Sequence, residues 1–357
     1  MERKRRVEIS VLNTLFCLTV IFIHIISYPV AAFSVNTIKY NMVMIPWRLC
    51  SFVVQGFVML SGIKLFLNKK DNLPFSVYLK GRIKGVIVPY AVCFAVYYLC
   101  FFAVYQYPLD AGFILEKFFT GDLVCHLYFI PIIFQFDLLF PVWKRLIGKC
   151  SEKIVIPIAI LFSMAMEMFF PRILNGIFSG FTFVYNDRLF TTYLSYWLIG
   201  CYIGKNYDKF CSMLKKHFSA IFIVFVLSLA TVTGFSYLAY NQLAYIPWIN
   251  IVHSIYVLAV CIFLYGIALK IPPHVWEKVP VLFKIDRASF YIYLYHMLAV
   301  LLAEWFLEEA GICAQGTAFV IRVIFAYGLT LPGCILYQKL SRFVKSKRRQ
   351  SREAGRI

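Results

Sequence analysis

Three histidines stand out because each lies within or beside a long apolar stretch, where titratable side chains are rare. His24 lies near the end of the first stretch, His126 opens the fourth, and His296 lies early in the ninth. Ionisable groups inside a membrane are costly and commonly mark functional sites, and imidazole can take and return a proton near neutral pH. Such a residue can activate a hydroxyl group as a base, or it can simply join two helices by hydrogen bonds.

Charged side chains also occur inside the apolar stretches. Asp137 and Glu167 fall in the fourth and fifth stretches. Asp137 needs a buried partner at such a position, and Arg48 is one candidate. Glu304 and Arg322 lie toward the ends of the last two stretches, and we expect them to form an ion pair between helices. No histidines show metal-ligand spacing such as His-x-x-x-His, so the sequence predicts no metal site.

The elements that position these residues follow from composition. The chain has 357 residues, of which 61% are hydrophobic, whereas a soluble domain is about half apolar at most. Because backbone groups in lipid must satisfy their own hydrogen bonds, runs of about 20 apolar residues predict membrane-spanning helices. The expected fold is all-α, a polytopic membrane bundle of about ten helices. The runs are residues 9–33, 46–67, 86–107, 126–147, 154–171, 190–204, 217–240, 250–269, 289–307 and 317–338.

The basic residues predict how the helices are oriented. When the N-terminus is placed in the cytoplasm, all but six of the 36 Lys and Arg residues fall on the cytoplasmic side. This asymmetry follows the positive-inside rule and predicts that both termini are cytoplasmic. His24 then lies about 25 Å into the first helix, toward the outer face, because a helix rises about 1.5 Å per residue. His296, early in its stretch, is expected nearer the cytoplasm.

No appended soluble domain or repeat is visible, so we expect one domain over residues 1–340 and a basic cytoplasmic tail over 341–357. The first stretch is too long for the apolar part of a cleaved signal peptide, which predicts a retained helix. The net charge of +19 is accounted for by the membrane topology, and we expect no nucleic-acid partner. Eleven scattered cysteines are expected to pack as small apolar residues.

Several segments, in order between residues 6 and 296, together resemble acyltransferase family 3 of integral membrane acyltransferases. They are Arg6-Val-Glu8 with Phe22-Ile-His24, Gly56-Phe-Val-Met-Leu-Ser61-Gly62, Tyr78-Leu-Lys-Gly-Arg82-Ile-Lys84-Gly-Val-Ile-Val-Pro89-Tyr90, Gly121 with His126-Leu-Tyr-Phe129, Tyr196-Trp-Leu-Ile-Gly200-Cys-Tyr-Ile-Gly204, and Ser289-Phe-Tyr-Ile-Tyr293-Leu-Tyr-His296. Each segment is a weak signature alone, but the set is specific at the level of the family.

The resemblance implies transfer of an acyl group, usually acetyl, from cytoplasmic acyl-coenzyme A. The implied acceptor is a hydroxyl of a cell-envelope glycan, such as an exopolysaccharide, or of a lipid-linked sugar, which makes the protein an O-acetyltransferase of the bacterial inner membrane. No bound cofactor is implied, since acyl-coenzyme A is a substrate. His24 is the implied catalytic residue with Glu8 in support, and Arg82 and Lys84 are implied to bind the donor.

Two positions depart from the family pattern. Asn13 stands where the family often has arginine, eleven residues before the histidine, and Gly85 stands near the second arginine of the paired basic motif. Both departures resemble the branch of the family that includes poly-N-acetylglucosamine export proteins. An exporter or flippase of a cell-surface polysaccharide is therefore the alternative function. His296 is a further catalytic candidate, which can shuttle protons or shape the donor path, or can instead join two helices. The remaining candidates for the site are His126, Asn13, Arg48 and Asp137.

Overall fold

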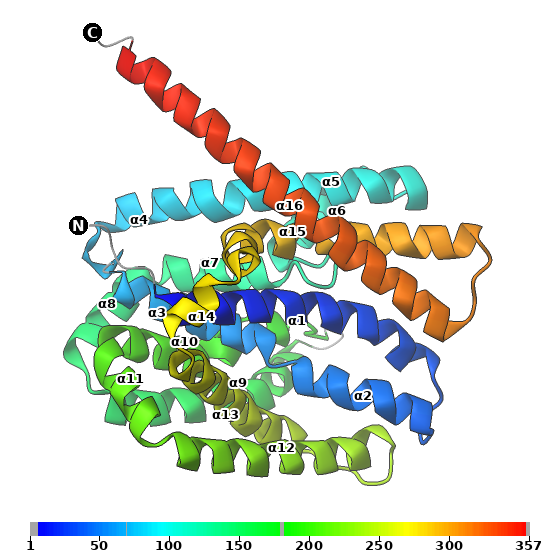
Figure 1. Cartoon of the computed structure of the whole chain (residues 1–357). Helices are drawn as coiled ribbons and strands as arrows, with labels where there is room; N and C mark the ends of the chain where they lie inside the picture. Colours follow the sequence, from blue (N-terminus) through cyan, green and yellow to red (C-terminus); the bar gives the residue numbers. More distant parts are fainter. Residues whose placement is uncertain (1–5, 69, 179–181, 355–357) are drawn as a thin grey trace. The chain divides into compact units, whose positions relative to one another are not determined.

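The computed structural model describes residues 6–68, 70–178 and 182–354, and every regular element in these ranges is a helix, which confirms the predicted fold class (Figure 1). Eight segments in this part of the chain are long and apolar enough to cross a membrane. They are α1 (Val7–Ala32), α2 (Ile38–Cys50) with α3 (Val53–Leu67), α4 (Phe75–Arg82) with η2 (Ile83–Ile87) and α5 (Val88–Tyr105), α9 (Glu152–Ile177), α12 (Phe218–Tyr240), α13 (Ile249–Lys270), α15 (Pro280–Glu309) and α16 (Gln315–Ala354).

Two of the ten expected spans fall on shorter helices. The expected span 126–147 is divided between α7 (Phe129–Leu138) and α8 (Phe140–Lys149), which are separated at Leu139, with Pro141 in the first turn of α8. The expected span 190–204 is α10 (Phe190–Lys205), which has 16 residues. Short connecting helices complete the fold: η1 (Lys70–Asn72), α6 (Ala111–Thr120), η3 (Asn186–Arg188), α11 (Tyr207–Lys216) and α14 (Pro273–Glu277).

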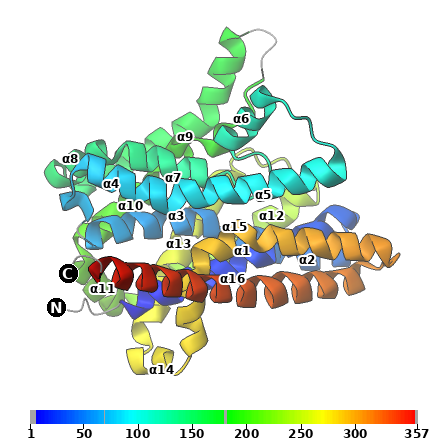
Figure 2. The same cartoon turned by 90° about the horizontal axis from the view of Figure 1, so that it is seen from above.

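The chain forms two compact units, and the chain passes between them several times. Unit 1 comprises residues 1–53, 223–252 and 262–357, and unit 2 comprises residues 54–222 and 253–261. Within unit 1, α15 and α16 run side by side along much of their length (Figure 2). Helix α16 continues without a break into the segment expected as a basic tail, of which residues 355–357 lie outside the described part.

Helices α1 and α15 of unit 1 run parallel. The Asn13 amide of α1 donates to Asp286 and Ser289 near the start of α15, while His24, farther along α1, meets His296, farther along α15. Two parallel helices that cross the same layer must begin on the same side of it. The arrangement therefore requires an even number of crossings from the start of α1 to the start of α15.

Helices α3 and α10 of unit 2 meet at their backbones. A Cβ atom at Gly204 would lie 2.5 Å from the carbonyl oxygen of Ile63, and one at Gly62 would lie 2.6 Å from that of Trp197, while Gly200 faces Met59 in the same way. Small residues allow such close approach between helices in membranes. The Gly-rich segment 196–204 therefore has a packing role in this fold.

Acidic and basic residues join the connecting segments of unit 2. Arg188 and Lys117 both bind the carboxylate of Asp122, at 2.6 and 2.8 Å, and the Tyr185 hydroxyl donates to Glu116 at 2.8 Å. Burial would raise the pKa of Asp122, but the hydrogen bonds from Lys117 and Arg188 outweigh burial and lower it. The segments around α6 and η3 are thus held together by a charged network.

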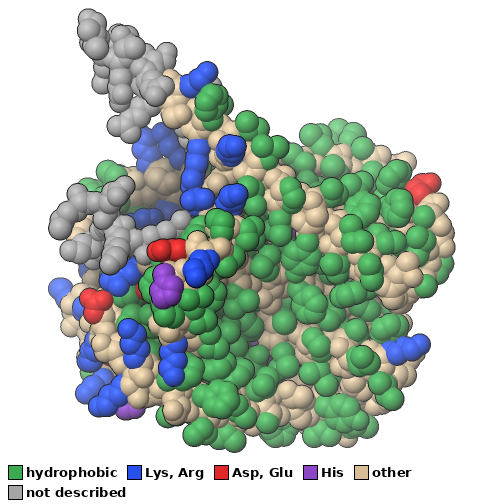
Figure 3. Space-filling model, in the orientation of Figure 1, with side chains coloured by type: hydrophobic (Ala, Val, Ile, Leu, Met, Phe, Trp, Pro, Cys, Tyr) green, Lys and Arg blue, Asp and Glu red, His purple; other side chains and the backbone are tan. Residues whose placement is uncertain are grey.

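Hydrophobic side chains cover most of the surface that faces the viewer in Figure 3. Many large apolar residues on the long helices are highly exposed, among them Leu99, Leu161, Leu227 and Ile324. A soluble protein rarely exposes apolar surface on this scale, whereas lipid would cover it at little cost. The exposed surface and the eight long helices together describe a multi-pass membrane protein.

Candidate functional site

The first cluster of candidate residues is a pair of imidazoles in unit 1. The rings of His24 on α1 and His296 on α15 have centroids 5.1 Å apart and planes inclined by 40°. His296 is fully buried, whereas His24 retains intermediate exposure. The structure therefore brings together two of the three histidines that the sequence singled out.

Backbone carbonyls select the tautomer of His296. Its Nδ1 lies 2.8 Å from the carbonyl oxygen of Tyr293 and 3.2 Å from that of Ile292. A carbonyl oxygen only accepts hydrogen bonds, so Nδ1 carries a proton, and in the neutral ring Nε2 is the acceptor. The ring is thus held in one orientation with its basic nitrogen directed away from its own helix backbone.

The expectation that the two histidines lie at different depths is wrong. Helix α15 begins at Pro280, nine residues before the expected start at residue 289, so that His296 lies well along it. The reason is that the first turns of α15 contain charged residues, Lys284, Asp286 and Arg287, which the apolar pattern excluded although they are helical. Because α1 and α15 run parallel, the two rings meet at similar distances from the helix starts.

A second polar layer joins the same two helices closer to their N-termini. The Asn13 Nδ2 donates to Asp286 Oδ1 at 2.8 Å and to Ser289 Oγ at 2.7 Å, and the Ser289 hydroxyl donates to the Asp286 carbonyl at 2.9 Å. Asn13 is 5% exposed. The position where the family often has arginine thus faces a carboxylate, and here a neutral amide binds it. Asn13 therefore joins α1 to α15 through a neutral side chain.

The second cluster of candidate residues is an ion pair in unit 2. Arg82 Nε donates to Asp137 Oδ2 at 2.7 Å, and the Tyr78 hydroxyl donates to Asp137 Oδ1 at 2.5 Å. Tyr78 and Arg82 are four residues apart on α4, so both side chains leave the same face of the helix. The Asp137 side chain is 1% exposed and that of Arg82 is 27% exposed. Asp137 thus holds the guanidinium through Nε.

The buried partner of Asp137 is therefore Arg82, not Arg48, which the sequence had offered as one candidate. Arg48 instead lies in unit 1, where its Nη2 donates to Asn250 Oδ1 at 3.4 Å and its guanidinium lies 5.9 Å from the ring centre of Tyr240. Residue 82 lies 55 positions from Asp137 in the chain. The two residues come together only because α4 packs against α7, which the sequence does not indicate.

A π-helical turn, η2, follows Arg82 directly and carries Lys84 and Gly85. Both residues are exposed, and a Cβ at Gly85 would meet no other atom. Turns of this type are rare and often occur at functional sites. Lys70 lies near Arg82: desolvation lowers the pKa of Lys70 although its side chain is exposed, and the charge of Arg82 lowers it further, while Asp137 raises it. Two cations, Arg82 and Lys70, thus lie near one buried carboxylate.

The other predicted residues are placed as follows. Glu304 and Arg322 form the expected pair between α15 and α16, with Nη2 and Oε2 3.0 Å apart, and the guanidinium lies over the ring of Tyr28. His126 is 2% exposed, and its ring lies 5.8 Å from that of Tyr97. Glu8, in the first turn of α1, is of intermediate exposure. The ion pair is confirmed.

Sequence reasoning missed three residues that complete these clusters. Tyr78 was noted only within a segment that resembles the family, yet it binds Asp137 directly. Asp286 binds Asn13 and lies three residues before Ser289, at the polar end of an apolar stretch, a position that could have drawn attention. Phe140 stacks on Tyr78 with ring centroids 4.1 Å apart, and no pattern in the sequence indicates this contact.

A comparison with known protein families identifies the family of this chain. The model of an acyltransferase domain, that of acyltransferase family 3, matches residues 6–339. This range includes both clusters, and the chain belongs to this family of membrane-bound acyltransferases.

One curated relative supports the same assignment. The Bacillus subtilis (strain 168) protein named "Putative membrane-bound acyltransferase YfiQ" is 25% identical over 237 residues, which is 64% of this chain and 65% of that protein. The match thus spans just under two thirds of the relative. No solved structure matches the chain.

Proposed function

We propose that the protein transfers an acyl group, with acetyl as our choice, from cytoplasmic acyl-coenzyme A to a hydroxyl of a cell-envelope glycan or a lipid-linked sugar. Family membership supports acyl transfer. The observation that carries the proposal for the chemical step is the close approach of the His24 and His296 rings inside a helix bundle.

In the proposed step, an imidazole nitrogen of His24 removes the proton from the acceptor hydroxyl. The oxygen attacks the thioester carbonyl, the carbon–sulfur bond breaks, and the proton passes to the departing thiolate, which gives an ester and free coenzyme A. His296 has its Nδ1 proton committed to backbone carbonyls, so it acts as a positioning residue that orients His24. Two imidazolium charges this close would repel each other, so one ring at a time is expected to hold the extra proton.

In the same proposal, the cations of unit 2 bind the donor. Arg82 is fixed by Asp137 through Nε, which leaves the other guanidinium nitrogens to meet phosphate oxygens, and Lys84 lies two residues away on the π-helical turn. Arginine suits phosphate because its planar group donates several hydrogen bonds at once. With the positive-inside topology, α4 begins on the cytoplasmic side, where acyl-coenzyme A is available.

The test is mass analysis of envelope glycans from wild-type cells, from cells that lack the gene and from cells with His24→Ala. We expect an acetyl-sized mass to be missing from both altered strains. His274→Ala is a matched control, because His274 is an exposed histidine on α14 of the same unit. Unchanged acylation together with polymer retained inside the cells would contradict the enzyme and favour the polysaccharide exporter.

A further inference from the structure

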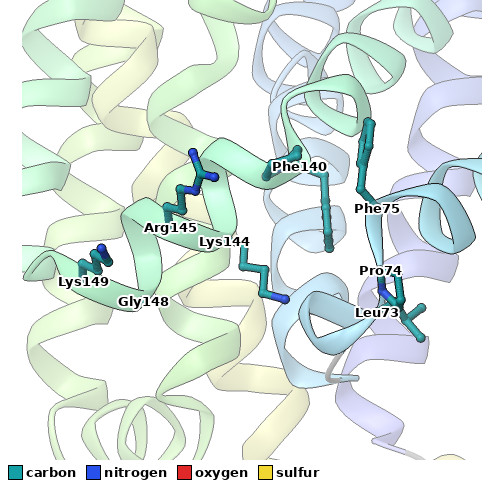
Figure 4. Close-up of a pocket in the computed structure, with 9 residues that line it drawn as sticks. Leu73, Pro74, Phe75, Phe140, Lys144, Arg145, Gly148 and Lys149 are labelled. Carbon is teal, nitrogen blue, oxygen red and sulfur yellow. The ribbon is translucent and has the colours of Figure 1, made fainter.

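A pocket of about 580 Å³ lies in unit 2 between α8 and the segment that leads into α4 (Figure 4). This volume is within the range of about 300–1,000 Å³ that is typical of small-molecule sites. None of its nine lining residues is acidic, and three of them, Lys144, Arg145 and Lys149, are exposed cations on α8. The nine lining residues therefore carry three positive charges and no negative charge.

Aromatic rings form part of the same pocket. Phe75 is 38% exposed, while Phe140 is 2% exposed and forms a floor. The two rings are nearly parallel, with an interplanar angle of 16° and centroids 6.3 Å apart. An exposed ring beside cations suits a flat heterocycle that carries phosphate groups, because a base stacks on aromatic faces while lysine and arginine bind phosphate.

The floor of the pocket is joined to the ion pair described above. The Tyr78 ring stacks on that of Phe140, with ring centroids 4.1 Å apart, and the Tyr78 hydroxyl donates to Asp137, which in turn accepts from Arg82. All of these residues belong to unit 2. The pocket and the Arg82 guanidinium are thus linked by a short series of contacting side chains within one unit.

We propose that this pocket binds the nucleotide end of the acyl donor, with the base against Phe75 and a phosphate on Lys144. This inference rests on the proposed function, because it takes the donor to be an acyl-coenzyme A. That donor has phosphates on both the 5′ and 3′ sides of its adenosine, so Arg82 and Lys84 alone leave part of its charge unmatched. In Figure 4, Lys144 extends from α8 toward Leu73 and Pro74, whereas Arg145 and Lys149 project elsewhere along α8.

An anionic lipid headgroup presents the same phosphate chemistry, and α8 carries apolar residues that lipid could cover. The two sources differ in what accompanies the phosphate. The nucleotide has a flat base that can stack on the Phe75 ring, whereas a phospholipid binds through its charge and its acyl chains. Replacing the ring and the cation separately therefore distinguishes the two ligands.

The experiment measures binding of coenzyme A and of adenosine 3′,5′-bisphosphate to the purified full-length chain in neutral-lipid nanodiscs. We expect Lys144→Glu to weaken binding of both about tenfold or more and Phe75→Ala to weaken it about fivefold or more. Lys209→Glu is the matched control, since it makes the same charge change at an exposed position of another short basic helix, α11, and should leave both affinities unchanged.

Equal affinities for the nucleotide in wild type, Lys144→Glu and Phe75→Ala would overturn the inference. The same conclusion follows if Lys144→Glu changes only the retention of phosphatidylglycerol in nanodiscs that contain it, because the pocket would then be a lipid site. A circular dichroism and thermal unfolding check keeps misfolded variants out of the comparison, and both substituted side chains are exposed.

A second donor separates this inference from the proposed function. The acetyl thioester of N-acetylcysteamine has the thiol end of coenzyme A but no nucleotide. We expect Lys144→Glu to lower kcat/KM about tenfold or more with acetyl-coenzyme A and to leave it unchanged with the short thioester. If Lys144→Glu leaves kcat/KM unchanged with both donors, the proposed nucleotide pocket is contradicted, while the proposed acyl transfer still stands. Lys144-dependent nucleotide binding in a protein that transfers no acyl group would support the pocket and contradict the proposed reaction.

Discussion

The two clusters of polar side chains inside this protein are built in opposite ways. The cluster of unit 1 is a pair of groups that can be neutral, His24 and His296, and backbone carbonyls set the tautomer of His296. The cluster of unit 2 depends on full charges, with Asp137 fixing Arg82. Neutral imidazoles in a low-dielectric setting can exchange protons, whereas a fixed guanidinium cannot lose its proton and serves to bind anions. This difference is consistent with the proposal of acyl transfer at the first cluster and donor binding at the second.

The largest expected effect is on the unit 1 cluster. Replacing His24 with alanine removes the proposed base, so turnover in membranes should fall about 10²–10⁴-fold while the affinity for the donor is retained. Steady-state transfer assays and direct donor binding measure the two quantities. Full turnover in a correctly folded His24→Ala protein would rule out this role, and His274→Ala serves as the control.

The next effect is on the unit 2 cluster, where we expect the affinity for the donor to change rather than the turnover. Arg82→Ala leaves the buried Asp137 carboxylate with Tyr78 but without its cation, and we expect a loss of about 3 kcal/mol in stability, the low end for a broken buried pair, because Arg82 is partly exposed. The Michaelis constant for the donor should rise, whereas turnover at saturation should change little. Thermal unfolding and transfer kinetics test this, with Arg82→Lys as the variant that keeps the charge. A selective loss of turnover would reverse the assignment of the two clusters.

A third substitution tests whether a charged pair in unit 1 also binds ligand. Glu304→Gln removes the charge from the partner of Arg322 but keeps a hydrogen-bond acceptor. We expect the protein to lose about 1–2 kcal/mol of stability and to keep its kcat and its KM for the donor. Thermal unfolding alongside the transfer assay measures both. A rise in KM for the donor would show that ligand binding is not confined to unit 2.

The smallest effect concerns the charged network around Asp122. Its pKa is lowered in the folded protein, so its carboxylate stabilises the fold above the usual aspartate pKa of about 4, and this contribution is lost as the pH falls through the lowered value. Asp122→Asn should therefore cost at most about 1 kcal/mol at pH 7. The difference in unfolding temperature from wild type should shrink as the pH falls below about 4. A constant difference across that range would mean that the charge of Asp122 is not its source.

Apolar length predicted most of the long helices because it is a local property. It also located α10, which extends one residue beyond the expected run 190–204, although the 16 residues of this helix are fewer than the roughly 20 that span a bilayer. The break between α7 and α8 has a local signal in Pro141, but the apolar run continues across it. The start of α15 was placed too late because its first turns are charged although helical.

The candidate site could be predicted in part only. His24 and His296 were identified because titratable groups inside apolar stretches are conspicuous, and the pair of Glu304 and Arg322 because neighbouring helices are joined by a short turn. The contact between His24 and His296 and the partner of Asp137 depend on which helices pack together and in which direction. One sequence contains no measure of that packing.

The glycine contact between α3 and α10 has a consequence for motion. Two helices that touch at their backbones cannot slide or roll past each other without Cα atoms striking carbonyl oxygens, as the approach of Gly62 to Trp197 and of Gly204 to Ile63 indicates. Helices α3 and α10 are therefore expected to move as one rigid body. If unit 2 opens and closes around a donor, the bending has to occur outside this helix pair. The wide turn η2 beside Arg82 is the natural place for a pivot, because the regular hydrogen-bond ladder of the helix is already interrupted there.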